Sequence, residues 1–95
     1  MSQPEMRVGP DGTKYWLLND KLHREDGPAI ECSDGRKFWY LHGKYHREDG
    51  PAIEYRNGEK RWFLNDKEVT WELVFRQAKT PEIELRILSA ALTNA

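Results

Sequence analysis

Two copies of one charged run, His23-Arg24-Glu25-Asp26 and His46-Arg47-Glu48-Asp49, carry the side chains best suited to chemistry in this chain. A histidine beside carboxylates can act as a general base, and histidine with aspartate or glutamate can bind a metal ion. Each run is followed by Gly-Pro-Ala-Ile-Glu, and the second copy lies 23 residues after the first. A catalytic site is normally a single constellation, so this repetition raises the alternative of a structural role.

The structural role is the favoured interpretation of these eight residues. In a stacked array, a run that recurs at a fixed period lies above its own copy, so Arg24 can pair with acids of its own loop or of the next one. The Gly-Pro pair then sets the turn into the following strand. Two histidines from adjacent loops are too few for a tetrahedral zinc site without further ligands. We therefore expect no enzyme, no metal and no cofactor, with a binding loop as the second interpretation.

The charged runs belong to a longer unit that is written twice and begun a third time. The first copy spans 11–33 and the second 34–56, and they agree at 15 of 23 positions. A partial third copy covers 57–69. Such a period predicts a stacked array in which each unit meets nearly the same neighbours. Residues 1–10 match the unit poorly and are expected to be irregular or an edge strand, and 70–95 are expected to form a helical cap.

Each copy begins with a strand pattern between two turn signals. Lys14 to Leu18 favours a strand and lies between Asp11-Gly12 and Asn19-Asp20. These dipeptides tolerate the positive φ angles that tight hairpin turns require. A short return segment and a loop then lead into Ala29 to Cys32. The sequence therefore predicts one mainly β domain with C-terminal α structure: an antiparallel meander of about six to seven short strands in hairpin repeats, capped by two helices.

The helical cap is predicted from start signals and apolar spacing. Thr80-Pro81-Glu82 combines a cap, a proline at the first helical position and an acid in the first turn, which predicts a helix from about Pro81 to Leu92. Thr70 is a suitable N-cap for a shorter helix before it. The last helix has more apolar surface than one packing contact needs. Three of its leucines are therefore expected to face the preceding helix or another molecule, including a homodimer mate: Leu85, Leu88 and Leu92.

Alternation within the strands separates two apolar faces. One face is unchanged between copies, as a core face should be, and carries Trp16, Leu18, Trp39, Leu41, Trp62 and Leu64. The other face varies but stays apolar, and it supplies the candidate partner-binding residues Tyr15, Leu17, Phe38, Tyr40 and Phe63. A sheet face in water is normally polar. We therefore expect the second face to be covered, by the chain's own helices at its C-terminal part or by a partner protein.

Composition narrows the classes of partner. The 95 residues carry a net charge of −1, from 15 basic and 16 acidic residues, and a single cysteine, Cys32. That balance removes the electrostatic drive toward nucleic acid or anionic membranes. Lysines at 14, 37 and 60 with aromatics between them keep a nucleic-acid binder as a weaker alternative. The lone thiol fits a reducing compartment, and no signal-like start or long apolar run occurs, so a soluble cytoplasmic protein is expected.

The phrase His-Arg-Glu-Asp-Gly-Pro-Ala, with Trp-x-Leu and a turn before it, resembles the tandem HREDGPA repeat proteins of bacteriophages and some bacteria, which are a variant of MORN-type (membrane occupation and recognition nexus) β-hairpin repeats. The resemblance covers about residues 11–67, and 64–70 are similar to the way such proteins leave the array for helices. It implies hairpins in one elongated sheet and a role in assembly, dimerisation or docking. A phage setting implies a small accessory protein that binds host machinery, such as a defence complex, in the host cytosol.

The leading functional interpretation is a non-enzymatic module that binds a bacterial host protein, with inhibition and scaffolding both left open. The alternative is a self-assembling homo-oligomer joined through the last helix or an exposed sheet edge. No membrane partner is expected, because the chain lacks both the regular glycine spacing of MORN repeats and a basic excess.

Overall fold

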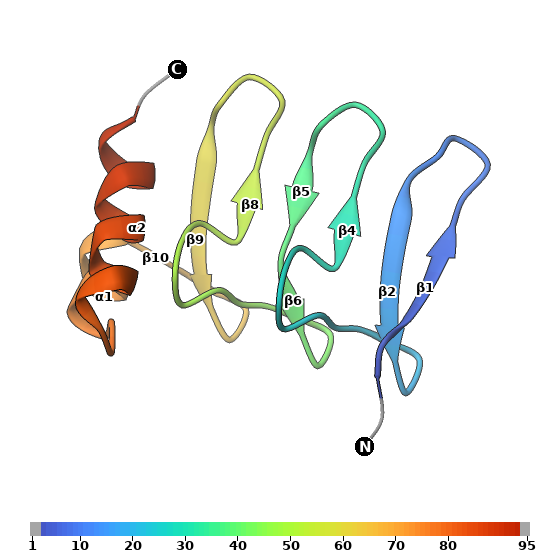
Figure 1. Ribbon diagram of the computed structural model, residues 1–95, viewed down its shortest axis with the longest axis horizontal. Coiled ribbons are helices and arrows are strands. Elements are labelled where there is room, and N and C mark those ends of the chain that lie inside the picture. Colours follow the sequence, from blue (N-terminus) through green and yellow to red (C-terminus); the bar gives the residue numbers. More distant parts are fainter. Residues whose placement is uncertain (1–2, 94–95) are drawn as a thin grey trace.

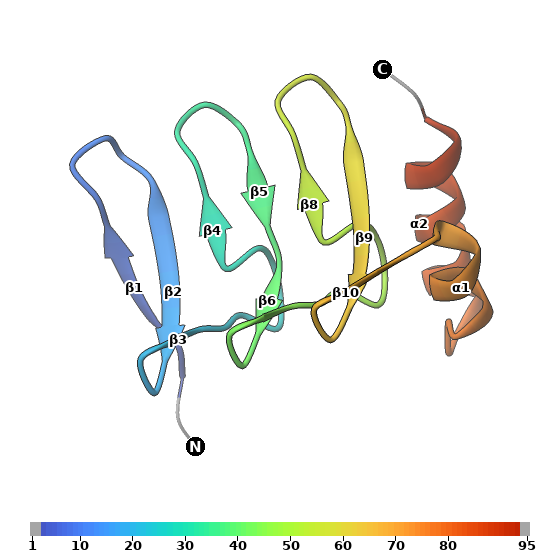
Figure 2. The same cartoon turned by 180° about the vertical axis from the view of Figure 1, so that it is seen from behind.

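The chain folds as a row of antiparallel hairpins closed at one end by two helices. The computed structural model describes residues 3–93, and the molecule measures 35 × 32 × 22 Å. Figure 1 shows three long hairpins side by side in sequence order, with the helices beyond the last hairpin and the first strand at the other end. Figure 2 shows the same order from behind. The predicted architecture, an antiparallel β meander with two C-terminal helices, is confirmed.

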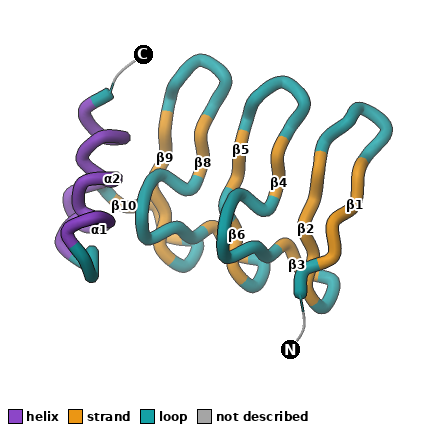
Figure 3. Tube along the Cα trace, viewed as in Figure 1, coloured by secondary structure: helices purple, strands orange, loops and turns teal. Residues whose placement is uncertain are grey.

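Ten strands and two helices lie within residues 3–93 (Figure 3). They are β1 (Glu5–Val8), β2 (Lys14–Leu18), β3 (Lys21–Leu22), β4 (Ile30–Glu31), β5 (Lys37–Phe38), β6 (Tyr40–Leu41), β7 (Lys44–Tyr45), β8 (Ile53–Glu54), β9 (Lys60–Leu64), β10 (Lys67–Val69), α1 (Trp71–Arg76) and α2 (Pro81–Leu92). Strands follow the order β1-β2-β4-β5-β8-β9-β10, while β3 pairs with β2 and β6 with β7. The number exceeds the six to seven strands predicted, because the return segments pair as separate strands and Trp39 interrupts the second repeat's strand.

The tight turns have the backbone that their residue types predict. Asn19 and Asp20 have φ angles of 52° and 64°, and the turns at His42-Gly43 and Asn65-Asp66 are likewise left-handed at both central residues. This is the conformation of two-residue hairpins whose twist matches that of their strands. Asparagine, aspartate, histidine and glycine adopt it at lower cost than other residues. Local sequence therefore sets where each hairpin reverses.

The helices pack on the face that carries the tryptophans, here called the tryptophan face (Trp16, Leu18, Trp39, Leu41, Trp62 and Leu64). Trp62 of β9 forms a buried cluster with Val74 of α1 and Ile87 of α2. Successive side chains of a strand point to opposite sides, so a helix seated on Trp62 lies across the sheet from Phe63. The expectation that the helices cover the C-terminal part of the second face is therefore wrong.

The first strand is a regular edge strand rather than an irregular segment. β1 pairs antiparallel with β2 over four positions, from Glu5 opposite Leu17 to Val8 opposite Lys14. All four residues of β1 are exposed. β1 stands at one end of the strand order, so among the strands of residues 3–93 it pairs with β2 on one side and with none on the other.

Candidate protein-binding face

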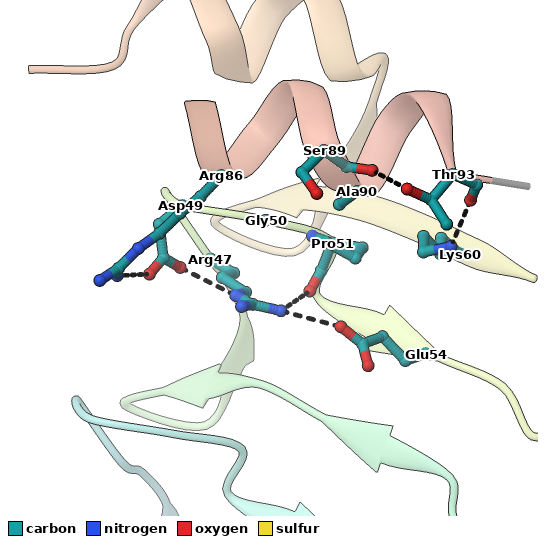
Figure 4. A pocket seen from close by; sticks show the side chains of 10 residues that line it. All are labelled: Arg47, Asp49, Gly50, Pro51, Glu54, Lys60, Arg86, Ser89, Ala90 and Thr93. Atoms are coloured by element: carbon teal, nitrogen blue, oxygen red, sulfur yellow. Dashed lines mark hydrogen bonds and ion pairs between the residues drawn. The ribbon is translucent and has the colours of Figure 1, made fainter. Parts of the chain in front are cut away.

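Arginines of the repeated run clamp each loop onto the tryptophan face. The Arg47 guanidinium lies 3.8 Å from the centre of the Trp39 ring. It donates hydrogen bonds to Asp49 at 2.8 Å, to Glu54 at 3.1 Å and to the Pro51 carbonyl at 3.0 Å. These three bonds are drawn in Figure 4. The first copy makes the same contacts from Arg24 to Trp16, Asp26, Glu31 and Pro28.

The glycine of the repeated phrase makes room for this arginine. An ideal Cβ built on Gly50 would lie 2.7 Å from Cζ of Arg47, and one on Gly27 would lie 2.9 Å from Cζ of Arg24. A real Cβ is not found that close to another heavy atom, so the arginine would have to move off its partners. The arginine and the glycine three residues later therefore act as one unit.

The histidines of the run join each hairpin to the next. Nδ1 of His23 accepts a hydrogen bond from the backbone N–H of His42 at 2.9 Å, and Nδ1 of His46 accepts one from Asn65 at 3.0 Å. Both donors belong to the tight turn of the following hairpin. Nε2 of His46 lies 2.9 Å from the carboxylate of Glu48, so both of its ring nitrogens are engaged. His23 is only 2% exposed. The residue types that suggested acid–base chemistry thus hold neighbouring units together.

Polar contacts at the pocket shown in Figure 4 join helix α2 and the residue after it to the loop of the second repeat, which contains Asp49, and to β9. Arg86 donates to Asp49 at 3.3 Å, and the Lys60 ammonium donates to the Thr93 carbonyl at 3.0 Å. Burial alone would raise the pKa of Asp49, but the hydrogen bonds and charges of Arg47 and Arg86 outweigh it and hold that pKa below its ordinary value. The cap is therefore joined to the array by charge as well as by the Trp62 cluster.

The lysines at 14, 37 and 60 are separated by glutamates rather than forming a basic stripe. Strand register places Glu31 between Lys14 and Lys37, and Glu54 between Lys37 and Lys60. Opposite charges directly across neighbouring strands attract one another. Alternating signs also cancel the field that would attract a phosphate backbone. This register gives the nucleic-acid alternative no support.

Outside the repeated run, the described residues with reactive side chains form no reactive site. Within residues 3–93, no three histidine, cysteine, aspartate or glutamate side chains stand together so as to hold a metal ion. Cys32 is half-buried, and burial raises the pKa of its thiol. Neither helix of this part of the chain has the length and apolarity needed to cross a membrane.

The aromatic face (Tyr15, Leu17, Phe38, Tyr40, Tyr45 and Phe63) is the side of the sheet opposite the loops and helices. Its centre is a cluster of rings around Tyr45, whose centroid lies 4.4 Å from that of Tyr40 in a stacked arrangement. Phe63 and Phe38 lie 5.0 and 6.4 Å from Tyr45. Burial, followed by the neighbouring Tyr45 hydroxyl, raises the pKa of Tyr40. The rings thus pack against one another, and no helix within residues 3–93 lies over them.

The five predicted partner-binding residues differ in exposure. Tyr15 is the most open, at 36%, and Leu17, Phe38 and Tyr40 are half-buried. Phe63 is only 8% exposed, where it packs with Ala52 and Ile53, so it supports the face from below rather than forming its outer surface.

Tyr45 was missed by sequence reasoning, although a signal was present. The His42-Gly43 turn makes a two-residue hairpin, and this loop length places Tyr45 directly opposite Tyr40. Residues directly opposite on an antiparallel pair share a face. The turn type could therefore have added Tyr45 to the aromatic face.

The outer side of α2 is a second open apolar surface. Leu85 and Leu92 are 66% and 72% exposed, whereas Leu88 is half-buried. Packing against α1 therefore covers only part of the apolar surface of α2. A scan of protein-family models, a search of curated proteins and a search of solved structures each find no match to this chain, so neither open surface is assigned by likeness to a known protein.

Proposed function

We propose that this chain is a non-enzymatic protein-binding module whose partner docks on the aromatic face. One observation supports the proposal: both arginine clamps and both helices lie on the tryptophan face, so neither covers the aromatic face, where Tyr15 is exposed and Tyr40 and Tyr45 are half-buried. Contiguous apolar patches on soluble proteins mark interaction sites. Aromatic residues are also the commonest anchors of protein interfaces.

The chemistry of the aromatic face fits a protein partner. Tyr15, Tyr40 and Tyr45 combine an apolar ring with a hydroxyl that can bond to a partner, as residues at interfaces commonly do. Charged pairs stand at both ends of the face. At one end Arg7 lies opposite Tyr15 and 2.8 Å from Glu5, and at the other end Arg61 is 2.7 Å from Glu68. An apolar centre with a charged rim is the usual anatomy of a protein interface.

The resemblance to phage repeat proteins favours a bacterial host protein as the partner, bound in the cytosol. Binding alone would then modulate or inhibit the host protein, by covering a surface that the host protein uses. The engaged histidines of the repeated runs are consistent with a module that acts without chemistry of its own.

The experiment is an affinity capture from nuclease-treated bacterial lysate with the wild-type chain and two variants as bait. Tyr15→Glu places a charge on the most exposed ring of the aromatic face, and Leu85→Glu places the same charge on the open side of α2. We expect one stoichiometric prey with wild type and Leu85→Glu, and its loss with Tyr15→Glu. With purified prey, Tyr15→Glu should raise Kd at least about tenfold. A prey lost with Leu85→Glu and kept with Tyr15→Glu would contradict the proposal.

A further inference from the structure

We propose that the open side of β1 pairs with β1 of a second copy of this chain, antiparallel and centred on Met6, so that two arrays join into one continuous sheet. The inference does not depend on the proposed function, because it concerns backbone pairing along the open edge of β1, although Glu5 and Arg7 also lie at the rim of the aromatic face.

β1 occupies a place in the repeat that is paired on both sides in later copies. Residues 5–8 align with 28–31 and 51–54 at the 23-residue period. In those copies, β4 lies between β2 and β5, and β8 lies between β5 and β9. Ala29 and Ala52, which align with Met6, are fully buried, whereas Met6 is 46% exposed. β1 therefore lacks the neighbour that every later copy has.

Hydrogen-bond parity shows which backbone groups of β1 face outward. The Gly9 N–H donates to the Thr13 carbonyl, and the bonded pairs of an antiparallel ladder alternate with non-bonded ones. Gly9, Arg7 and Glu5 therefore bond to β2, while Met6 and Val8 direct their N–H and C=O groups to the open edge. The Trp16 N–H bonds to Ala29, away from Met6, as this parity requires.

Charge selects one register for the pairing. Outward residues must lie opposite outward residues, so a two-fold axis can pass through a residue of β1 but not between two residues. An axis at Met6 or Arg7 pairs three residues of each β1, whereas one at Glu5 or Val8 pairs only one. An axis at Glu5 or at Arg7 opposes two like charges. An axis at Met6 places each Glu5 directly opposite Arg7 of the other copy, and opposite charges at such positions attract. The Met6 N–H groups then bond reciprocally, and each Val8 N–H can reach the Pro4 carbonyl of the other copy.

The same register suits the apolar side chains of the edge. Met6 lies directly opposite Trp16 on β2, on the tryptophan face. The two Met6 side chains would meet at the axis with a Trp16 on each side, and a thioether packs well beside aromatic rings. Val8, which is 58% exposed, would lie opposite Pro4 of the other copy. Edge strands commonly carry charges that repel a second strand, whereas this alternation attracts an identical one.

The test is the oligomeric state of the full chain, measured by sedimentation at concentrations up to about 1 mM, a range that detects weak pairing. Wild type should form a reversible dimer. Glu5→Arg and Arg7→Glu each oppose like charges in the pairing and should weaken dimerisation at least about tenfold. An equal mixture of these two variants should recover a heterodimer, because every opposed pair is then attractive. That recovery also shows that both variants are folded.

Two controls separate this edge from other routes to a dimer. Arg56→Glu changes the net charge as Arg7→Glu does, but it lies in the exposed turn between β8 and β9, and it should leave the dimer unchanged. Leu88→Glu should also leave it unchanged. The proposal is overturned by a wild type that stays monomeric throughout, by a dimer that is insensitive to both charge reversals, or by one that is lost only with Leu88→Glu.

Discussion

Arg47 shows how a charged residue in a repeated run can stabilise the fold. Its guanidinium stacks on Trp39 and bonds to two carboxylates and a carbonyl, and no other residue type supplies that planar set of donors. Sequence pattern predicted ion pairs for this run but not the stacking, because the loop had to fold back over the sheet before the ring came within reach.

The first prediction concerns coupling between Arg47 and Gly50. Gly50→Ala should destabilise the fold by about 1–2 kcal/mol, because the new Cβ displaces the guanidinium from its partners. In an Arg47→Ala background the same change should be close to neutral. Chemical denaturation of the four proteins in this cycle measures the coupling. A cost for Gly50→Ala that is equal in both backgrounds would show that the clash is not with Arg47.

A matched control separates this coupling from backbone strain. Gly35 has φ 101° and nothing within 4 Å of an added Cβ. Gly35→Ala should therefore be costly through conformation alone. Its cost should be the same with and without Arg47.

The second prediction concerns the acid side of the stability curve. The pKa of Asp49 is lower in the folded state than its ordinary value of 3.8, because Arg47 and Arg86 favour its charged form. A carboxyl with a depressed folded pKa contributes stability that is complete above its unfolded pKa and is lost as pH falls through the folded one. Asp49→Asn should therefore flatten the fall in unfolding free energy below about pH 4. If the unfolding free energy falls equally steeply with pH in wild type and in Asp49→Asn, Asp49 does not contribute to acid unfolding.

At the scale of elements, α1 and α2 replace the arginine clamp at the end of the array. The third copy has no equivalent of Arg24 or Arg47, and Trp62 is covered instead by Val74 and Ile87. An aliphatic cluster over the ring carries no charge, so this end of the array needs no carboxylates to pair with a buried guanidinium. The helical cap therefore closes a core that the next repeat would otherwise cover.

The third prediction tests this cap. Ile87→Ala should destabilise the fold by about 2–4 kcal/mol, because Ile87 is fully buried against Trp62. Leu85→Ala on the exposed side of the same helix should change stability by less than about 0.5 kcal/mol. Thermal or denaturant unfolding followed by tryptophan fluorescence measures both. Equal costs for the two variants would mean that α2 does not seal the array through Ile87.

The elements themselves could be predicted from local signals, but their cover could not. The Asn19-Asp20 turn and the Pro81 start carry their own backbone preferences, so the hairpins and the bounds of α2 follow from a few residues. The sheet face that the helices cover could not be predicted, because Trp62 and Phe63 are both apolar and alternation alone does not show which of the two faces is buried. Burial of Phe63 by its own neighbours removed the need for a covering helix on that side.

Across the whole molecule, the two faces of one sheet differ in what covers them. The tryptophan face is covered by loops that recur with the repeat and, beyond the last hairpin, by the two helices. The aromatic face varies between copies, and neither the clamped loops nor the helices cover it. The two ends differ as well, since one is sealed by helices and the other ends in an unpaired strand edge. This asymmetry underlies both proposals, a partner protein on the aromatic face and a second copy at the β1 edge.

The measurement that tests the account most directly is hydroxyl-radical footprinting of the chain alone and in complex with its captured partner. Side-chain oxidation reports which face is covered, and backbone methods do not. We predict protection of Tyr15, Tyr40 and Tyr45, with Leu85 oxidised equally in both states. Protection of Leu85 and Leu92 with the tyrosines unchanged would contradict it, because the partner would then sit on α2 and the aromatic face would be no binding site.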